Sequence, residues 1–318
     1  MGKIEEQQLE NWFKELQSRD FDRKTRALNF LKDNVKQKEV RDGLITMASD
    51  LNIFKTPFRA ELVKFLCQRG KLSLEELDMF RRDSNEIIRR EAVRCFAKRG
   101  GEKSVKYLLK SLEDPYQWVR LFALRGLVKI RGYDKTDPKF RSAIIKMLGD
   151  GDEINRKEAL RIVERFGEKA TPELIEAFKS GNKLLKYSTL GILGRIGNQE
   201  ANEFLIQNLK SGNPRIKRIA LRYVGNNQLP EAVPNMLDIY KKEKDFQTSI
   251  EIALGKIGTK AIPQLIAQYS ERPQLQDLIV STLNNGLPAG RLTILKELKK
   301  IPKQEARTLK SKLKLDEN

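Results

Sequence analysis

Short amphipathic segments follow one another along this chain, and the same pattern of apolar and polar positions returns about every 30 residues. In the segment 117–130, apolar side chains fall at the spacing of one helix face, and a basic residue stands three positions before a central alanine, Ala123. Successive copies of this arrangement lie 30 to 36 residues apart. Because a period of about 20 to 50 residues is typical of proteins whose units bury their apolar faces only against their neighbours, the pattern predicts a repeat fold. The central residues of the copies, called anchors below, are Ala27, Leu62, Ala92, Ala123, Ala159, Thr189 and Ala220, and Ile250 continues the series.

Each copy contains two apolar segments separated by a polar turn. Around Ala123, the segment 105–112 is followed by polar residues and then by a second segment, 119–130. The apolar positions follow the helical period, and none alternates with a period of two, so we expect paired helices and no sheet. A glycine in a left-handed conformation, which ends a helix, is expected after the second helix of three copies, at Gly167, Gly197 and Gly258.

Polar residues between the paired segments also repeat. An aspartate stands six positions before a basic residue in three consecutive copies, and the next two copies have serine and lysine at these positions. Over about residues 15–275, this D-x5-[RK]-x2-A-[LV] pattern resembles HEAT repeats, especially the short bacterial kind named after phycobilisome lyases. The resemblance implies a right-handed α-solenoid of about eight helix pairs, in which these residues form a structural ladder between neighbouring turns. The ladder residues are Asp83, Arg89, Asp114, Arg120, Asp150, Arg156, Lys186 and Lys217.

The ends of the chain fit less well to the repeat. We expect a single solenoid over residues 1–290, with a looser N-terminal cap unit at 1–35. Residues 291–318 are rich in lysine and arginine and carry an apolar helical stripe. They are expected to form a basic C-terminal capping helix with a frayed tail, and a second contact with an anionic partner is the alternative.

The register defined by the anchors brings further basic residues together. Positions two and six after each anchor lie four apart on the second helix and therefore share one face. Asp33 is the only acidic residue in these two columns. The resemblance implies that second helices line the concave surface of the solenoid, so we expect a basic concave face, although an ordinary solvated face is the simpler alternative. Its expected binding residues are Lys64, Arg90, Arg94, Lys98, Arg125, Lys129, Arg161, Arg165, Arg195 and Arg222.

The overall charge agrees with an anionic partner. Lysine and arginine number 62 against 43 aspartates and glutamates, which gives a formal net charge of +19. We expect a non-enzymatic scaffold that holds an acidic protein segment. The alternative is a sequence-nonspecific protein that binds the nucleic-acid backbone, including a relative of the HEAT-like alkylpurine DNA glycosylases. Such enzymes need aromatic residues in the groove, whereas Trp12 and Trp118 lie outside the basic columns and are expected to pack, which leaves Tyr187.

Several classes of site are excluded by composition. The chain has no histidine, so nucleophile–histidine catalysis is absent, and its two cysteines cannot form a typical zinc site. We expect no metal, no cofactor and no small-molecule substrate. Cys67 and Cys95 are expected to be buried free thiols of a cytoplasmic protein. The start of the chain lacks an apolar leader, no apolar stretch is long enough to span a bilayer, and no membrane role is expected.

Overall fold

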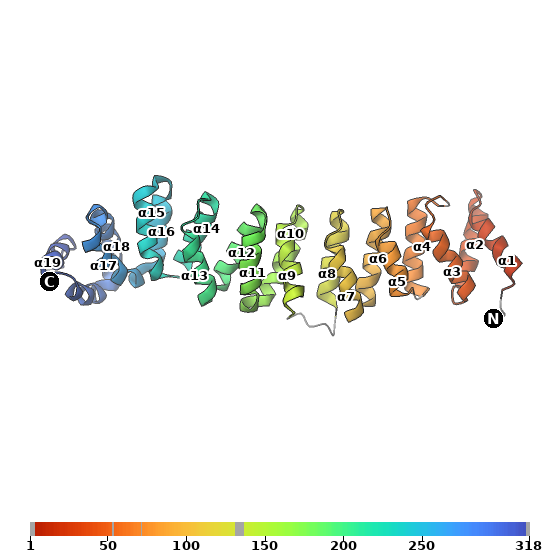
Figure 1. The fold of residues 1–318 in the computed structure, drawn as a ribbon, viewed down its shortest axis with the longest axis horizontal. Coiled ribbons are helices and arrows are strands. Elements are labelled where there is room, and N and C mark those ends of the chain that lie inside the picture. The colour runs from red at the N-terminus through yellow and green to blue at the C-terminus, as the bar shows by residue number, and fades with distance from the viewer. Residues whose placement is uncertain (1–3, 53, 71, 131–136, 316–318) are drawn as a thin grey trace. The chain divides into compact units, whose positions relative to one another are not determined.

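The structure is a computed structural model that describes residues 4–52, 54–70, 72–130 and 137–315. Every regular element within these ranges is a helix, and none is a strand, which confirms the all-α prediction. In the described ranges the helices form nine successive pairs and one final helix, one pair more than the sequence suggested (Figure 1).

The chain divides into two compact units, each described here by itself. The first comprises residues 1–147 and 151–162. Its helix pairs are α1 (Glu6–Leu16) with α2 (Phe21–Asp33), α3 (Lys38–Ser49) with α4 (Thr56–Arg69), α5 (Leu74–Arg81) with α6 (Glu86–Arg99), α7 (Glu102–Ser111) with α8 (Gln117–Lys129), and α9 (Pro138–Lys146) with α10 (Glu153–Val163).

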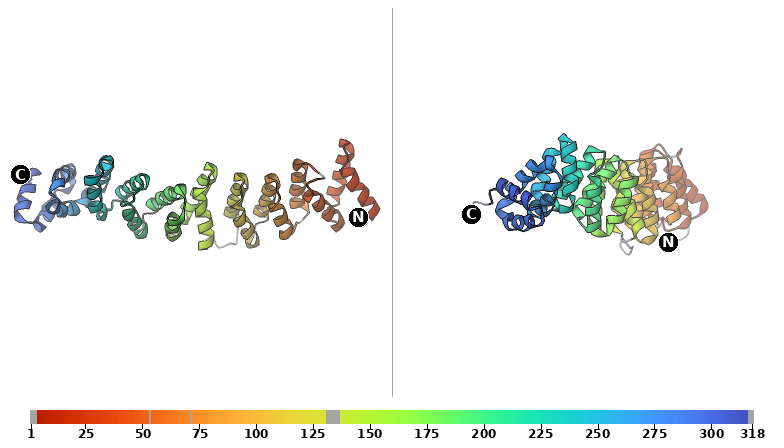
Figure 2. Two further views of the ribbon diagram at one scale, coloured as in Figure 1. Left: turned by 45° about the horizontal axis from the view of Figure 1, so that its top comes forward. Right: turned by 60° about the vertical axis from the view of Figure 1, so that its left-hand side comes forward.

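The second unit comprises residues 148–150 and 163–318. Residue 291, the expected start of the capping helix, lies inside the long helix α18, and a separate helix follows it. Figure 2 shows the helices of each unit in chain order from two further directions. The helices of this unit are α11 (Thr171–Ser180) with α12 (Lys183–Ile196), α13 (Gln199–Asn208) with α14 (Pro214–Asn226), α15 (Val233–Lys242) with α16 (Gln247–Ile257), α17 (Ile262–Glu271) with α18 (Gln276–Glu297), and α19 (Lys303–Lys312).

The anchors lie at the centre of the packing. All eight are fully buried, and most are alanine, so adjacent second helices can approach closely. Within the first unit α6 packs against α4 and α8, and within the second unit α14 packs against α12 and α16. In both units these second helices contact one another more extensively than the first helices do. The repeat therefore builds one layer of closely packed second helices in each unit.

Side chains and glycines define where the helices begin and end. Ser73 and Glu76 form a capping box at the start of α5, and the Asn182 side chain accepts a hydrogen bond from the backbone at the start of α12. The three glycines expected to end second helices all have positive φ. Gly197 is in the left-handed helical region, at φ 65° and ψ 16°, whereas Gly167 and Gly258 have ψ of −145° and −138°.

Glycine at position 194 permits a close contact between adjacent second helices. A Cβ atom built on Gly194 would lie 2.1 Å from the ring of Tyr223, whereas one built on Gly191 would meet no atom within 4 Å. We expect Gly194→Ala to lower the free energy of unfolding by about 1–3 kcal/mol through overpacking. Gly191→Ala, in the same helix, should instead raise it by about 0.5–1 kcal/mol because alanine favours helix. Urea unfolding followed by circular dichroism checks both, and an unchanged midpoint for Gly194→Ala would contradict the contact.

Candidate binding surface

The basic residues three positions before the anchors point between repeats. Arg59 is 1% exposed, forms an ion pair with Asp83 of the following repeat, and donates from Nε to the Ala48 carbonyl at 2.8 Å. Arg89 donates two hydrogen bonds to Asp114 of its following repeat, at 2.8 and 3.0 Å. The hydrogen bond with Asp114 raises the pKa of Arg89 above its ordinary range, so the guanidinium stays charged.

The same arginines also hold the turn of their own repeat. Arg89 donates to the carbonyl of Asp83 at 3.0 Å, and Arg120 donates to the carbonyl of Asp114 at 2.8 Å. Each also donates to the carbonyl five residues before it, and Arg156 makes this second contact with the Gly151 carbonyl at 2.9 Å. Residues six apart therefore meet through the backbone, while the carboxylates of Asp83 and Asp114 accept from the arginine of the preceding repeat.

The lysines at this position in the second unit have different partners. Lys186 lies 5.9 Å from the centre of the Phe178 ring. Lys217 is buried and pairs with Glu243, and its ammonium lies 4.9 Å from the Phe246 ring. Sequence reasoning placed Arg59 in the column of basic residues before the anchors but did not pair it with Asp83, 24 residues later. It did not identify Glu243, which lies 26 residues after Lys217, close to the 25 residues between Arg89 and Asp114.

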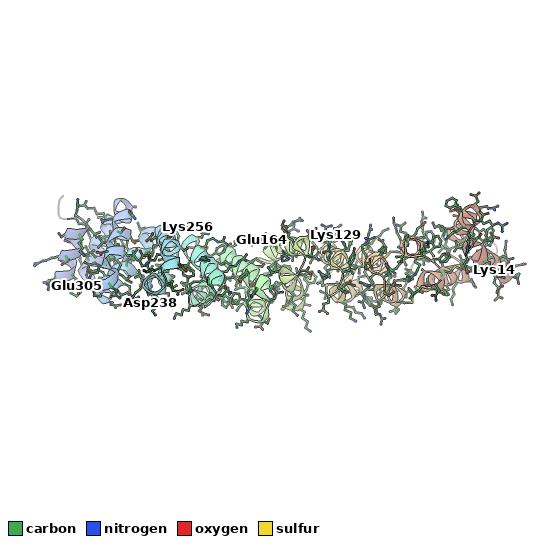
Figure 3. The ribbon with its side chains drawn as sticks, turned by 90° about the horizontal axis from the view of Figure 1, so that it is seen from above. Lys14, Lys129, Glu164, Asp238, Lys256 and Glu305 are labelled. Atoms are coloured by element: carbon green, nitrogen blue, oxygen red, sulfur yellow. A yellow bond between two sulfur atoms is a disulfide. The ribbon has the colours of Figure 1, made fainter. Side chains whose placement is uncertain are left out.

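Three expected binding residues of the first unit are exposed lysines in successive repeats. Lys64 lies on α4, Lys98 on α6 and Lys129 on α8. Among the described residues, none of these lysines has a carboxylate or hydrogen-bond partner. Figure 3 shows Lys129 pointing outward from one side of the first unit. We call this set the lysine row.

The arginines beside the lysine row are partly neutralised. Glu91, only 7% exposed, lies 3.4 Å from both Arg90 and Arg94. Glu158 lies 3.8 Å from Arg125 and 3.2 Å from Arg161. The two glutamates come directly before anchors, outside the two columns that sequence reasoning compared. The sequence does carry a signal for these ion pairs. Glu91 and Arg94 are three residues apart, as are Glu158 and Arg161, and residues at this spacing are neighbours on a helix surface.

One acidic residue of the second unit, Glu164, has the same effect on Arg195. Arg195 pairs with Glu164 at 2.9 Å and donates to the Tyr223 hydroxyl at 3.3 Å. Arg222 lies 4.8 Å from the centre of the Tyr223 ring. Arg165 is exposed, and the described residues of this unit give it no ion-pair partner. Figure 3 shows Glu164 on one side of the second unit together with Lys256, opposite Asp238 and Glu305.

The aromatic residues singled out in the sequence have different surroundings. The guanidinium of Arg215 lies 4.4 Å from the Tyr187 ring centre, and the Tyr187 hydroxyl lies 3.4 Å from the Asn213 amide. Trp12 stacks on Phe30 with the ring centroids 4.4 Å apart, as expected of a packing residue. Trp118 was expected to pack as well, but its side chain is 37% exposed at the start of α8.

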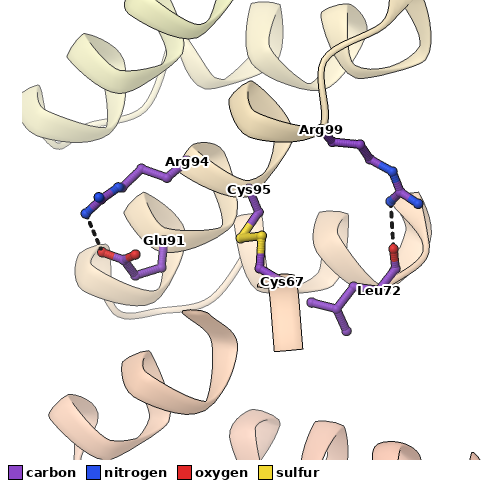
Figure 4. Close-up of a disulfide and its surroundings, with 6 residues drawn as sticks. All are labelled: Cys67, Leu72, Glu91, Arg94, Cys95 and Arg99. Carbon is purple, nitrogen blue, oxygen red and sulfur yellow. Dashed lines mark hydrogen bonds and ion pairs between the residues drawn. A yellow bond between two sulfur atoms is a disulfide. The ribbon is translucent and has the colours of Figure 1, made fainter. Parts of the chain in front are cut away.

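The expectation of free thiols is wrong. Cys67 of α4 and Cys95 of α6 form a disulfide, with their Cα atoms 5.8 Å apart (Figure 4). Their separation of 28 residues is close to one repeat, which places them on adjacent second helices that pack together. Disulfides are typical of oxidising compartments, so the cytoplasmic location expected from the sequence gains no support from this bond.

Metal clusters and membrane-spanning helices were two further possibilities for the described part of the chain. It contains no cluster of three metal-ligating side chains. No helix described in the structure combines the length and the apolar character that crossing a bilayer requires.

The comparisons with known proteins address the fold. No curated protein matches the chain in sequence. Similar solved structures include an engineered protein, 17% identical, covering 96% of this chain and 97% of that chain with a TM-score of 0.35. YibA of Escherichia coli is 16% identical over 81% of this chain and 95% of its own, with a TM-score of 0.37. The complex of CpcE and CpcF of phycocyanin lyase from a Nostoc species is 19% identical over 81% of this chain and 88% of that chain, with a TM-score of 0.26.

At these identities and TM-scores, the similarities carry no information about activity. The family comparison is more informative, because the HEAT-repeat family matches residues 75–160 and 171–255, more than half of the chain. The matched residues include the second helices α6 and α8 of the first unit and α12 and α14 of the second. The chain therefore belongs to the HEAT-repeat family.

Proposed function

We propose that the chain is a non-enzymatic scaffold that binds an acidic protein segment along its second helices. HEAT repeats typically serve as surfaces for protein binding, and the family membership supports this part of the proposal. The acidic character of the partner rests on one observation. Lys64, Lys98 and Lys129 are exposed in three successive repeats, and the described residues supply no carboxylate to neutralise them.

The spacing of the lysine row suggests the form of the partner. Packed helices lie about 8–10 Å apart, and an extended chain advances about 3.3 Å per residue. A carboxylate at every third residue of an extended segment would therefore meet Lys98 and Lys129, which both lie six residues after their anchors. Lys64 lies two residues after its anchor, one helical turn away, and would meet a carboxylate displaced toward that turn. Arg94, Arg125 and Arg161 lie beside the row, and Glu91 and Glu158 already neutralise part of their charge.

A nucleic-acid backbone is the second candidate ligand for the same cations. It needs only phosphate contacts. Base stacking would also need a free aromatic ring; Arg215 covers Tyr187, whereas Trp118 at the start of α8 is 37% exposed. The glutamates on the second helices repel phosphates and carboxylates alike, so they do not distinguish the two ligands. Because HEAT repeats typically serve as protein-binding surfaces, we favour the acidic segment and make nucleic acid an outcome of the experiment.

The test replaces Lys64, Lys98 and Lys129 together with glutamine. Binding of a labelled peptide with glutamate at every third position should weaken about 10- to 100-fold, since each exposed charge pair contributes roughly 0.5–1 kcal/mol. Fluorescence anisotropy at several salt concentrations measures it, with single-stranded and duplex oligonucleotides as competing probes.

The matched control replaces Lys103, Lys110 and Lys139, exposed lysines on the first helices α7 and α9 of the same unit. It removes the same charge and should leave peptide binding within about twofold of the native value. If net charge alone governed binding, this control would weaken it as much as the first triple variant does. Equal losses in the two triple variants would refute a specific surface. Tight oligonucleotide binding that only the first triple variant loses would favour the nucleic-acid alternative.

A further inference from the structure

The disulfide borders a cavity that the proposed function does not use. The cavity has a volume of about 340 Å³ and lies between α4, the loop after it, α5 and α6. This volume falls at the lower end of the range of small-molecule sites. Its lining residues are Cys67, Gln68, Leu72, Leu77, Cys95, Lys98 and Arg99.

The two cysteines that line this cavity differ in their exposure. Cys95 is only 5% exposed, whereas Cys67 is half-buried and is followed by the exposed Gln68. A nucleophile that enters the cavity therefore reaches Cys67 first. The leaving sulfur is then that of Cys95.

Two cations line the same cavity as the sulfur atoms. Arg99 is held in place by a hydrogen bond from Nη1 to the Leu72 carbonyl at 2.6 Å (Figure 4). Lys98 is exposed, is three residues after Cys95 on α6, and has no partner among the described residues. A positive charge beside a cysteine favours its thiolate. Cys95, whose sulfur is the leaving group, lies on α6 together with Lys98 and Arg99, so these cations stabilise the thiolate that forms. The same charges attract an anionic reactant into the cavity.

We propose that this cavity is a thiol–disulfide exchange site for a small anionic thiol, and that Cys67 is its point of modification. The reactant thiolate attacks Cys67 Sγ, the Cys67–Cys95 bond breaks, and the electron pair stays on Cys95 Sγ as a thiolate. The products are a mixed disulfide on Cys67 and one free cysteine at position 95. Attack of a second thiolate on the mixed disulfide releases the small-molecule disulfide and leaves both cysteines reduced, a two-electron reduction of the protein by two thiols.

The experiment uses the folded, oxidised full chain with reduced glutathione as the anionic probe and 2-mercaptoethanol as the neutral one. Samples are quenched with an alkylating reagent and examined by intact mass and peptide mapping. We expect no alkylation before thiol is added. The first product should then carry one glutathionyl group on Cys67 and one alkyl group on Cys95. Alkylation of both cysteines at the start, or glutathione on Cys95, would overturn the proposal.

Lys98→Gln tests the role of the cavity charge, and Lys129→Gln is its matched control. Both variants remove one cation of the lysine row, so any loss of partner binding is common to the two. We expect only Lys98→Gln to slow the reaction with glutathione relative to 2-mercaptoethanol, by about 2- to 5-fold, the effect of one exposed charge. Equal ratios in both variants, or a reaction that occurs only in denaturant, would reject the site while leaving the proposed function untouched.

Discussion

Replacement of Arg59 by methionine is expected to lower the free energy of unfolding of the first unit by about 3–5 kcal/mol. The guanidinium is 1% exposed and is the ion-pair partner of Asp83, whose side chain is 9% exposed. Methionine fills a similar volume, so the expected loss comes from the carboxylate that is left buried and unpaired. Both tryptophans of the chain, Trp12 and Trp118, lie in the first unit, so urea unfolding followed by tryptophan fluorescence reports this unit.

A second substitution separates the unpaired charge from lost packing. Asp83 also accepts a hydrogen bond from the backbone of Asn85 at 2.9 Å, which an asparagine side chain can replace. The double variant Arg59→Met with Asp83→Asn should therefore recover a large part of the lost stability. Arg82→Met is the control and should change stability by less than about 1 kcal/mol, because the Arg82 side chain is exposed and its partner Asp78 keeps a second ion pair with Arg81. If the double variant is no more stable than Arg59→Met, the unpaired carboxylate is not the cause.

Loss of the disulfide is expected to have an effect of similar size. The bond closes a loop with a sequence separation of 28 residues, and closure of a loop of this length stabilises the folded state by about 3–4 kcal/mol through the entropy of the unfolded chain. The variant in which serine replaces both Cys67 and Cys95 should show this loss by tryptophan fluorescence in urea. Native protein treated with an excess of reductant should unfold at nearly the same urea concentration as this double serine variant.

The double serine variant also supplies the control for the reductant. Its unfolding midpoint should be the same with and without reductant, because it has no bond to reduce. A native chain whose midpoint does not move on reduction would contradict a stabilising disulfide. A reductant effect of equal size on the variant would show that the reagent acts elsewhere.

Repeated local signals made much of the fold predictable. Each anchor lies on an apolar helical stripe, and all eight anchors are buried as the register requires. Asn182 caps a helix and Gly197 ends one through interactions within a few residues, which a single sequence carries. The ninth helix pair escaped the count because no anchor in the series marks α18.

The candidate surface was only partly predictable. The columns correctly indicated exposed cations at Lys64, Lys98 and Lys129. The charges at the positions two and six after each anchor did not show that Glu91 and Glu158 contact neighbouring arginines. Both glutamates stand directly before an anchor, outside those positions. The contact between Arg125 and Glu158 joins residues 33 positions apart, so it depends on how one repeat is placed on the next.

By itself, the sequence determined the helical repeat and its register, because these follow from periodicity within each helix. Only the tertiary structure decided which basic residues stay free, which are neutralised, and that Cys67 and Cys95 are joined. The physical reason is that ion pairs and disulfides need atoms within a few ångströms. In a stack of helices, such distances are set by the packing of adjacent repeats rather than by spacing along the chain.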